Sequence, residues 1–224
     1  MKPRLLDLFC GAGGAAMGYS RAGFEVVGVD NRPMPRYPFE FIQADALEFM
    51  DAGGWRGFDA IHASPPCQAY VTLANRWRGK STRADGHPRL IEPTRNRLVA
   101  TGLPWVIENI VPAPVKGAIL CGSMFDLGVR RHRKFEANFW FLSPRCAHAL
   151  HPDIAGVYGD HPDGGRLWTR ISGGGVHRRA VNLTDGRTRM GIDWMDWREL
   201  CESIPPAYTE YIGGWLIKAL AATS

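Results

Sequence analysis

The stretch RLLDLFCGAGG, residues 4–14, decides the fold that the sequence predicts. Its first part, residues 4–9, is an almost continuous apolar run, which is typical of a buried strand in a parallel sheet. Its second part is rich in glycine and leads into a helical stretch from Ala15 to Ala22, which Gly23 is placed to end. A strand, a glycine turn and a helix in this order form the first unit of an open α/β sheet, and such sheets bind ligands beside this turn.

The same alternation of apolar runs and helical stretches continues along the chain. We expect strands at 24–29, 39–42, 58–63 and 104–107, and helices at about 46–50 and 91–101, the second stopped by Gly102. The pattern predicts an α/β protein with a doubly wound, mainly parallel sheet. We assign residues 1–141 to a catalytic and cofactor-binding domain, 142–190 to a small loop-rich region, and 191–224 to helices that return to the first domain. The last helix is expected from about Tyr208 to Leu220.

Composition and charge restrict the class of protein. The chain has 224 residues, 45% of them hydrophobic, which suits a globular domain. It has no apolar run long enough to span a membrane and no separate signal region, so we expect a cytoplasmic, monomeric protein with no membrane contact. The net charge of +5 suits a polyanionic partner. Arginines and lysines cluster in three stretches, at 76–89, 130–134 and 166–189, which favours contacts with phosphates.

Carboxylates follow the first three predicted strands and suit a nucleoside ligand. Asp30 ends the second strand, where it can accept hydrogen bonds from two ribose hydroxyls, and Asp45 follows the third, where it can bind an adenine amino group. The glycine turn also satisfies the loose dinucleotide fingerprint, so a nicotinamide-dependent oxidoreductase remains an alternative. Asp7 argues against that alternative, because a carboxylate in the first strand would repel pyrophosphate but could hold the ammonium group of an adenosyl amino acid.

A candidate nucleophile follows the fourth predicted strand. Two prolines precede Cys67 and stiffen the backbone that presents its thiol. Glu108 and Asn109 follow the fifth strand, so a carboxyl group lies on the same edge of the sheet. Arg131 and Arg133 have alternate spacing and would point the same way if that segment is extended.

These motifs, in this order, resemble those of the DNA cytosine-5 methyltransferase family. The residues that carry the resemblance are DLFCGAGG at 7–14, PPCQ at 65–68, ENI at 108–110 and Arg131-x-Arg133, followed by MGIDW at 190–194 and IPPAY at 204–208, as in short, phage-like members. The resemblance covers nearly the whole chain except about 141–189. Two departures stand out: Val129 replaces a glutamine that many members have, and Pro206-Ala207 replaces a common Gly-Asn pair.

The resemblance implies the fold of an S-adenosylmethionine-dependent methyltransferase, Rossmann-like, that acts on duplex DNA. It implies S-adenosylmethionine as cofactor and residues 142–190 as the region that recognises the target sequence. The implied catalytic residues are Cys67, Glu108, Arg131 and Arg133. The implied cofactor-binding residues are Asp7, Phe9, Cys10, Gly11, Gly13, Gly14, Asp30, Asn31, Asp45, Ala46 and Pro66.

The implied chemistry is covalent catalysis with acid assistance. Cys67 attacks carbon 6 of a cytosine flipped out of the duplex, while a protonated Glu108 assists at ring N3. Glu108 must then be at least partly buried to hold its proton, and a nearby arginine would help by lowering the pKa of Cys67. We expect Asn109 to brace the loop that carries Cys67, and residues 68–89 to form a loop over the base.

Two further alternatives remain open. The chain could be a non-catalytic DNA-binding relative that retains the fold, although intact Cys67 and Glu108 argue against this. It could act on RNA, as one relative methylates transfer RNA, but the Cys-Phe-Thr signature of that relative is absent here.

The cysteines give little reason to expect a metal ion. They are five in number and show no CxxC spacing, so neither disulfides nor a cysteine-rich zinc site is indicated. Cys146, His148 and His151 lie close in sequence, but their spacing fits no common zinc finger. We therefore expect surface histidines and no metal.

Overall fold

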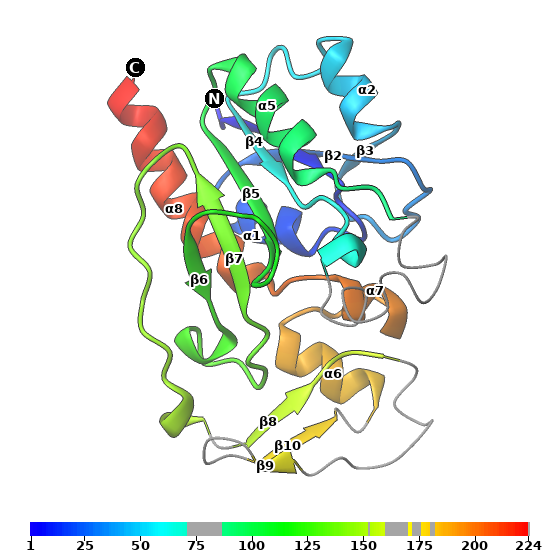
Figure 1. Cartoon of the computed structure of the whole chain (residues 1–224), viewed down its shortest axis with the longest axis vertical. Coiled ribbons are helices and arrows are strands. Elements are labelled where there is room, and N and C mark those ends of the chain that lie inside the picture. The colour runs from blue at the N-terminus through cyan, green and yellow to red at the C-terminus, as the bar shows by residue number, and fades with distance from the viewer. Residues whose placement is uncertain (71–86, 152, 160–169, 172–175, 180–181, 224) are drawn as a thin grey trace.

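The computed structural model describes residues 1–70, 87–151, 153–159, 170–171, 176–179 and 182–223. Its centre is a seven-stranded sheet with the order β3-β2-β1-β4-β5-β7-β6 (Figure 1). The strands are β1 (Arg4–Leu8), β2 (Glu25–Asp30), β3 (Glu40–Gln43), β4 (Ala60–Ala63), β5 (Trp105–Ile110), β6 (Ala118–Leu120) and β7 (Arg133–Ala137). The pairs from β3 to β5 are parallel, whereas β7 runs antiparallel to both β5 and β6. The expected mainly parallel sheet is thus confirmed.

Helices cover both faces of this sheet. They are α1 (Gly14–Arg21) and α8 (Pro206–Thr223) on one face, and α2 (Ala46–Asp51) and α5 (Ile91–Thr101) on the other. Alternate residues of β1 enter the two cores: Leu5 packs with Tyr19 and Tyr208 on the first face, while Leu6 packs with Leu98 on the second. Because β1 is covered on both faces, it has no solvent side, and Leu5, Leu6 and Leu8 are all fully buried.

A smaller three-stranded sheet lies beside the main one. It has the order β8-β10-β9, from β8 (Asp153–Gly156), β9 (Arg170–Ile171) and β10 (Val176–Arg179), and α6 (Leu183–Met190) and α7 (Trp197–Glu202) lie between it and the main sheet in Figure 1. A third core joins Ala155 and Val157 to Met190 and Leu200. The region 142–190, expected to be small and loop-rich, thus contains short strands, which a core supplied largely from outside the segment stabilises.

The elements expected in the first 110 residues are present, with ends that differ by at most three positions. Helix α5 ends as expected at Gly102, which has φ of 70°. Strands β6 and β7 were not expected, because β7 reads RKFEA and shows only one large apolar residue. Helix α8 begins at Pro206, two residues earlier than expected. A proline is tolerated there because the backbone N–H groups of the first helical turn have no partner within the helix, so the missing N–H of proline costs no hydrogen bond. Within the described residues, no helix has the length and hydropathy needed to cross a membrane.

Candidate active site

The turn after β1 is held open by its backbone conformation. Phe9, Gly11 and Gly13 have φ of 57°, 50° and 85°. The N–H of Cys10 donates to the Val29 carbonyl at 3.2 Å, which ties the turn to β2. A Cβ atom placed on Gly11 would meet no atom within 4 Å, so this glycine faces open space that a ligand can enter.

Packing, rather than a ligand, explains the other glycines of the turn. A Cβ on Gly13 would lie 2.8 Å from Pro38, and one on Gly14 would lie 1.9 Å from the Ser203 hydroxyl oxygen and 2.5 Å from the Ile204 carbonyl oxygen. Trp194 closes the same contact from the C-terminal segment, because its indole N–H donates to the Ala12 carbonyl at 2.7 Å. The two terminal parts of the chain therefore build this turn together.

Asp30 lies beside the open side of the turn. One carboxylate oxygen accepts the N–H of Gly11 at 3.1 Å, and the other accepts the N–H of Arg32 at 3.1 Å. Each oxygen retains a lone pair for a further donor. Asn31, next in the chain, is exposed, and its carbonyl accepts a hydrogen bond from Gln43.

Asp45 has a structural role of its own. It is the N-cap of α2, and one of its oxygens accepts the N–H groups of Leu47 and Glu48 at 2.9 and 3.0 Å. Ala46, behind it, is buried. An adenine contact by Asp45 would therefore use its second oxygen, and it stays a prediction.

Asp7 is completely buried in the sheet. Neither of its oxygens, nor the hydroxyl of the neighbouring Tyr37, has a hydrogen-bond partner in good geometry among the described residues. Burial, together with the charge of Asp30, holds the pKa of Asp7 well above its usual range. The carboxyl is thus suited to a cationic partner, but a ligand ammonium reaches it only if a neighbouring side chain moves aside.

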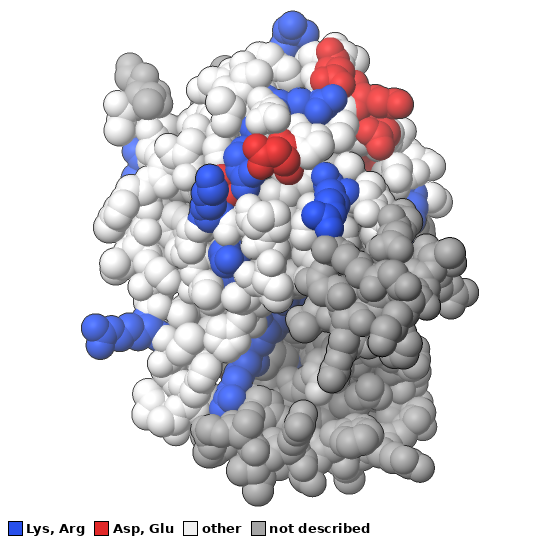
Figure 2. Space-filling model, viewed as in Figure 1, with Lys and Arg blue, Asp and Glu red and all other residues white. Residues whose placement is uncertain are grey.

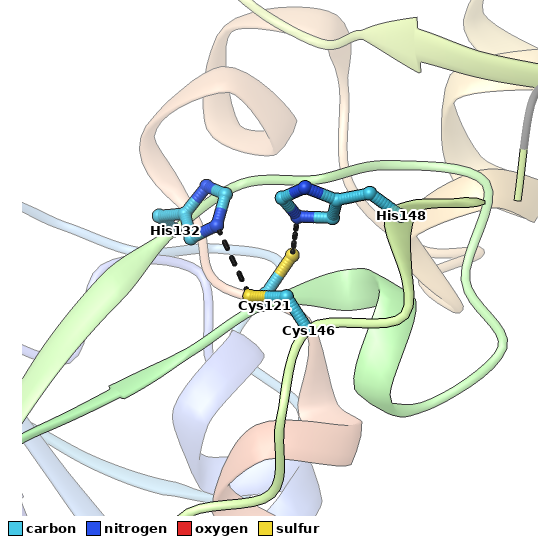
Figure 3. A group of neighbouring side chains, drawn as sticks. All are labelled: Cys121, His132, Cys146 and His148. Atoms are coloured by element: carbon cyan, nitrogen blue, oxygen red, sulfur yellow. Dashed lines mark hydrogen bonds between the residues drawn. The ribbon is translucent and has the colours of Figure 1, made fainter. Parts of the chain in front are cut away.

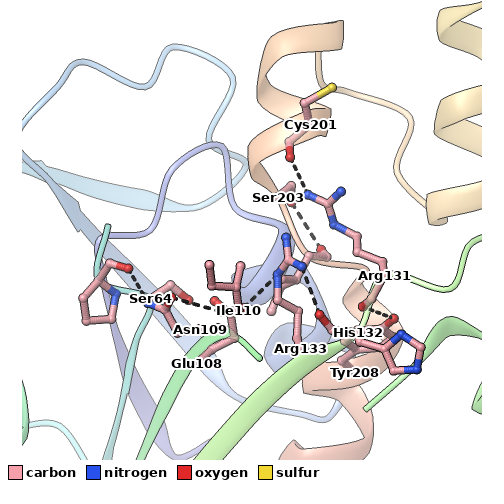
Figure 4. A network of polar contacts seen from close by, with 12 residues as sticks. Ser64, Glu108, Asn109, Ile110, Arg131, His132, Arg133, Cys201, Ser203 and Tyr208 are labelled. Carbon is pink, nitrogen blue, oxygen red and sulfur yellow. Dashed lines mark hydrogen bonds and ion pairs between the residues drawn. The ribbon is translucent and has the colours of Figure 1, made fainter. Parts of the chain in front are cut away.

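Cys67 lies in the loop after β4, half-buried, immediately before a short 3-10 helix, η1 (Gln68–Tyr70). The side-chain amide of Asn109, in β5, donates to the Pro65 carbonyl at 2.7 Å (Figure 4). The expected bracing of this loop by Asn109 is confirmed. Pro66 stands between the braced carbonyl and the thiol, so the loop that carries the Cys67 thiol is held against the neighbouring strand.

Glu108 is buried in β5, and only 6% of its surface is exposed. Its carboxylate forms an ion pair with the Arg133 guanidinium at 3.1 Å (Figure 4). Burial raises the pKa of Glu108, although Arg133 and the Ser64 hydroxyl act in the opposite direction. The expected burial of Glu108 is confirmed, and its role as a proton donor stays a prediction.

Arg131 does not point the same way as Arg133. Its φ of 34° breaks the extended backbone that alternate spacing assumed. Its guanidinium donates to the Val157 carbonyl at 2.9 Å and to the Cys201 carbonyl, so it reaches toward β8 and α7 (Figure 4). The expectation of parallel side chains was wrong: Arg133 faces Glu108, and Arg131 links the two sheets. A cavity of about 310 Å³ lies beside both arginines, lined also by Tyr158 and Cys201.

The pKa of Cys67 is set by opposing effects. Burial raises the pKa of the thiol, Arg133 lowers it, and Glu108 raises it. The arginine acts in the expected direction, but burial outweighs it, so the pKa lies above the ordinary value for cysteine. The free protein therefore holds Cys67 as a thiol at neutral pH.

Two polar residues of the site were not singled out from the sequence. His62, fully buried in β4, contacts the Tyr19 hydroxyl at 3.0 Å and the Ser64 hydroxyl at 2.9 Å. Burial lowers the pKa of His62 to about 3, so this imidazole is neutral. Ser64 in turn hydrogen-bonds Glu108. The signal was present as a histidine inside the apolar run AIHA.

Part of the basic stretches expected to contact phosphate lies outside the described residues. This part comprises Arg76, Arg78, Lys80, Arg83 and Arg166, and residues 71–86 of the expected loop 68–89 lie outside as well. Of the third stretch, Arg187 donates to the Met195 carbonyl and Arg189 pairs with Asp185, both at 2.7 Å. These two arginines hold α6 in place, so the reading of the whole stretch as phosphate-binding was too broad.

Comparison with solved structures places the fold among known proteins. A prophage-encoded E. coli protein assigned as a DNA modification methyltransferase matches 98% of the chain and 99% of its own length, with a TM-score of 0.62 and 16% identity. The Entamoeba histolytica methyltransferase EhMeth and a mutant Spodoptera frugiperda DNMT2 match over the same shares, with TM-scores of 0.59 and 0.56 and identities of 13% and 12%. The fold is that of the S-adenosylmethionine-dependent methyltransferases.

Sequence similarity to known proteins is limited. No protein-family model matches the chain. A stretch of 88 residues is 28% identical to the Type II methyltransferase M.AgeI of Thalassovita gelatinovora. The match covers 33% of this chain and 20% of that protein. The chain thus matches about a fifth of that relative's length. With identities this low, the structural likeness establishes the methyltransferase fold and leaves the activity to the site itself.

Strand order bears on the nicotinamide alternative. The dinucleotide-binding fold has six strands in the order 3-2-1-4-5-6. This methyltransferase fold instead inserts β7 between β5 and β6, antiparallel to both. Because Arg133 begins β7 and faces Glu108 in β5, the inserted strand also completes the candidate catalytic group.

Proposed function

We propose that this chain is a DNA methyltransferase that transfers a methyl group from S-adenosylmethionine to carbon 5 of cytosine. One observation carries the proposal: a half-buried thiol in the loop after β4 lies beside β5, which holds a buried carboxyl with a raised pKa, and this carboxyl is paired with an arginine. Asp30, with a free lone pair on each oxygen, and Gly11, which faces open space, fit the ribose of the cofactor. S-Adenosylmethionine supplies the methyl group as an electrophilic sulfonium.

The residues divide the chemistry between them. Cys67 loses its proton to a base or to solvent and its thiolate bonds to carbon 6, while Glu108 gives its proton to ring N3. Carbon 5 becomes electron-rich and would form a bond to the methyl carbon as the bond between that carbon and the cofactor sulfur breaks, which leaves a neutral thioether. A base then takes the proton from carbon 5, the bond from Cys67 to carbon 6 breaks, and N3 returns its proton. Arg133 orients Glu108 throughout, and Asn109 fixes the loop that bears the thiol.

Duplex DNA is the proposed substrate because the charge of the described surface suits phosphate. On the face shown in Figure 2, the visible acidic side chains gather in the upper half, whereas the described lower part carries lysines and arginines. The target cytosine must leave the base stack to reach Cys67, which costs roughly a few kcal/mol. We assign the recognition of the target sequence to residues 142–190, whose arginines can read guanine in the major groove.

The experiment that tests the proposal is adduct formation with 5-fluorocytosine. Bisulfite sequencing of DNA treated with enzyme and S-adenosylmethionine first identifies the target sequence. A duplex with 5-fluorocytosine at that target should then trap the protein as a denaturant-stable adduct, because fluorine cannot leave carbon 5 as a cation. Peptide mapping should place the bond at Cys67.

Two cysteine variants control this experiment. Cys67→Ala should abolish the adduct, whereas Cys10→Ala, in the turn after β1, should still form it even if cofactor binding weakens. An adduct that persists in Cys67→Ala, or methylation of the correct target with no adduct, would contradict the proposed mechanism. Calorimetry with S-adenosylmethionine and with NAD separates this function from the nicotinamide alternative.

A further inference from the structure

Four potential metal ligands converge at the edge of the main sheet. Cys121, His132, Cys146 and His148 each offer one sulfur or nitrogen atom, and these atoms all lie within 4.8 Å of one another (Figure 3). The Cys121 sulfur lies 3.3 Å from a nitrogen of His148, and the Cys146 sulfur lies 3.5 Å from a nitrogen of His132. In a tetrahedral zinc site, bond lengths near 2.3 Å to sulfur and 2.0 Å to nitrogen put ligand atoms about 3.3–3.8 Å apart.

The four residues come from separate segments. Cys121 follows β6, His132 precedes β7, and Cys146 and His148 lie at the start of the chain that leads to the small sheet, where η3 (His148–Leu150) begins. The spacing 121, 132, 146 and 148 matches no common finger, which is why the sequence did not predict the site. His151, which the sequence grouped with Cys146, instead faces Asp126 at 3.4 Å.

The residues around the four ligands hold them close together, and the ligand set itself is one that zinc binds. The Ser123 hydroxyl lies 3.2 Å from the Cys121 sulfur and accepts the N–H of Ala147 at 3.1 Å, so it holds the two sides of the group together. Two cysteines with two histidines, in a closed group of four, is a ligand set typical of structural zinc.

We propose that Cys121, His132, Cys146 and His148 bind one Zn²⁺ ion that has a structural role. The ion joins the β6–β7 connection to the segment that leads to the small sheet. His132 lies between Arg131 and Arg133, and its carbonyl accepts a hydrogen bond from Arg133 at 3.1 Å. The metal therefore positions the backbone from which both arginines project. This proposal replaces the expectation of surface histidines and no metal.

Metal analysis of the purified full chain tests the proposal. We expect about one zinc per chain, lost in Cys121→Ser and in His148→Gln. Cys201→Ser and His151→Gln are matched controls, a cysteine and a histidine outside the group, and should retain zinc. Zinc that stays at the same level in all four variants, or wild-type protein that holds none and takes up none from added Zn²⁺, would overturn the site.

A second measurement does not depend on variants that fold. Wild-type protein stripped of metal by a chelator is titrated with Co²⁺, and a site with two thiolates in tetrahedral geometry gives sulfur-to-cobalt charge-transfer bands and intense visible d–d bands. Their absence would contradict the ligand set. Hydrogen exchange on the same samples tests positioning: stripping should speed exchange at residues 118–135 and leave β1 and β2 unchanged. Equal exchange at 118–135 with and without metal would contradict the positioning role.

Discussion

Two carboxyl groups at the edge of the sheet are held in opposite ways. Asp30 is buried and accepts two backbone N–H groups, whereas Glu108 is buried beside Arg133 in a position that raises its pKa. The difference matches the two tasks proposed for them. A charged carboxylate binds ribose hydroxyls, and a protonated one gives its proton to a base.

Substitution of Asp30 should weaken cofactor binding. A hydrogen bond to a charged group contributes about 1.5–3 kcal/mol, so loss of even one ribose contact in Asp30→Ala should reduce affinity for S-adenosylmethionine by at least about tenfold, as measured by calorimetry. Asp45→Ala should reduce it by less than about tenfold, since a single edge contact contributes about 0.5–1.5 kcal/mol. Unchanged affinity in Asp30→Ala would remove this residue from the site.

Asp7 should make stability depend on pH. Its pKa is raised in the folded protein, so the folded state binds the proton more tightly than the unfolded chain does. Its contribution to stability is therefore fully present below the unfolded pKa and is lost as pH rises through the folded pKa.

Asp7→Asn removes this titration. Denaturant unfolding at about pH 4 and pH 8 should show the variant gaining stability relative to wild type as pH rises. A relative stability that is the same at both pH values would show that Asp7 is not held protonated. Calorimetry with S-adenosylmethionine on the same variant tests the contact between Asp7 and the ligand ammonium. Loss of that contact in Asp7→Asn should weaken cofactor binding.

At the scale of elements, the contact between α1 and α8 depends on a glycine. A Cβ on Gly18 would lie 2.1 Å from the Pro206 carbonyl oxygen and 2.1 Å from the Thr209 hydroxyl oxygen. The same hydroxyl donates to the Ala15 carbonyl at 2.8 Å, so the two helices are bonded where they approach most closely. This contact also brings Ser203 and Ile204 against Gly14, at the start of α1.

Gly18→Ala should force these helices apart and destabilise the protein by about 1–3 kcal/mol, because overpacking costs that much in a close contact. Gly214→Ala is the matched control in α8: its Cβ would meet nothing within 4 Å, and alanine favours a helix over glycine by about 0.5–1 kcal/mol. Unfolding in urea measures both. Equal effects of the two substitutions would mean that the approach of α1 to α8 is less close than the structure has it.

At the scale of the whole molecule, Arg131 joins parts that lie far apart in sequence. It leaves the segment before β7 and binds the carbonyls of Val157, after β8, and Cys201, in α7. The hydroxyl of Tyr208, in α8, donates to the Arg131 carbonyl at 3.0 Å. One residue thus connects the main sheet, the small sheet and the C-terminal helices.

Arg131→Gln should loosen the small sheet without unfolding the main one. Loss of two hydrogen bonds from a charged donor should lower the free energy of unfolding by about 1.5–3 kcal/mol or more. Hydrogen exchange should increase at residues 153–159 and 197–202 and stay unchanged in β1 and β2. Exposed Arg198→Gln, in α7, serves as control. Protection that is unaltered at 153–159 would show that Arg131 does not join the two sheets.

The sequence by itself determined the strand–turn–helix unit at residues 4–21, the parallel arrangement of the early strands, and the candidate thiol after β4 and carboxyl in β5. These features are local, because an apolar run, a glycine turn or a proline pair imposes its conformation on its own residues. The bracing of Pro65 by Asn109 followed as well, since adjacent parallel strands end at the same edge.

Only the tertiary structure decided the rest. The polar β7 forms because β5 and β6 offer it hydrogen-bond partners, Gly14 and Gly18 are glycines because the C-terminal segment packs on them, and Arg131 turns away from Glu108 toward two distant carbonyls. The Cys121, His132, Cys146 and His148 group has the same origin. Each of these features depends on contacts between residues far apart in the chain, and the spacing of residues along a sequence does not predict such contacts.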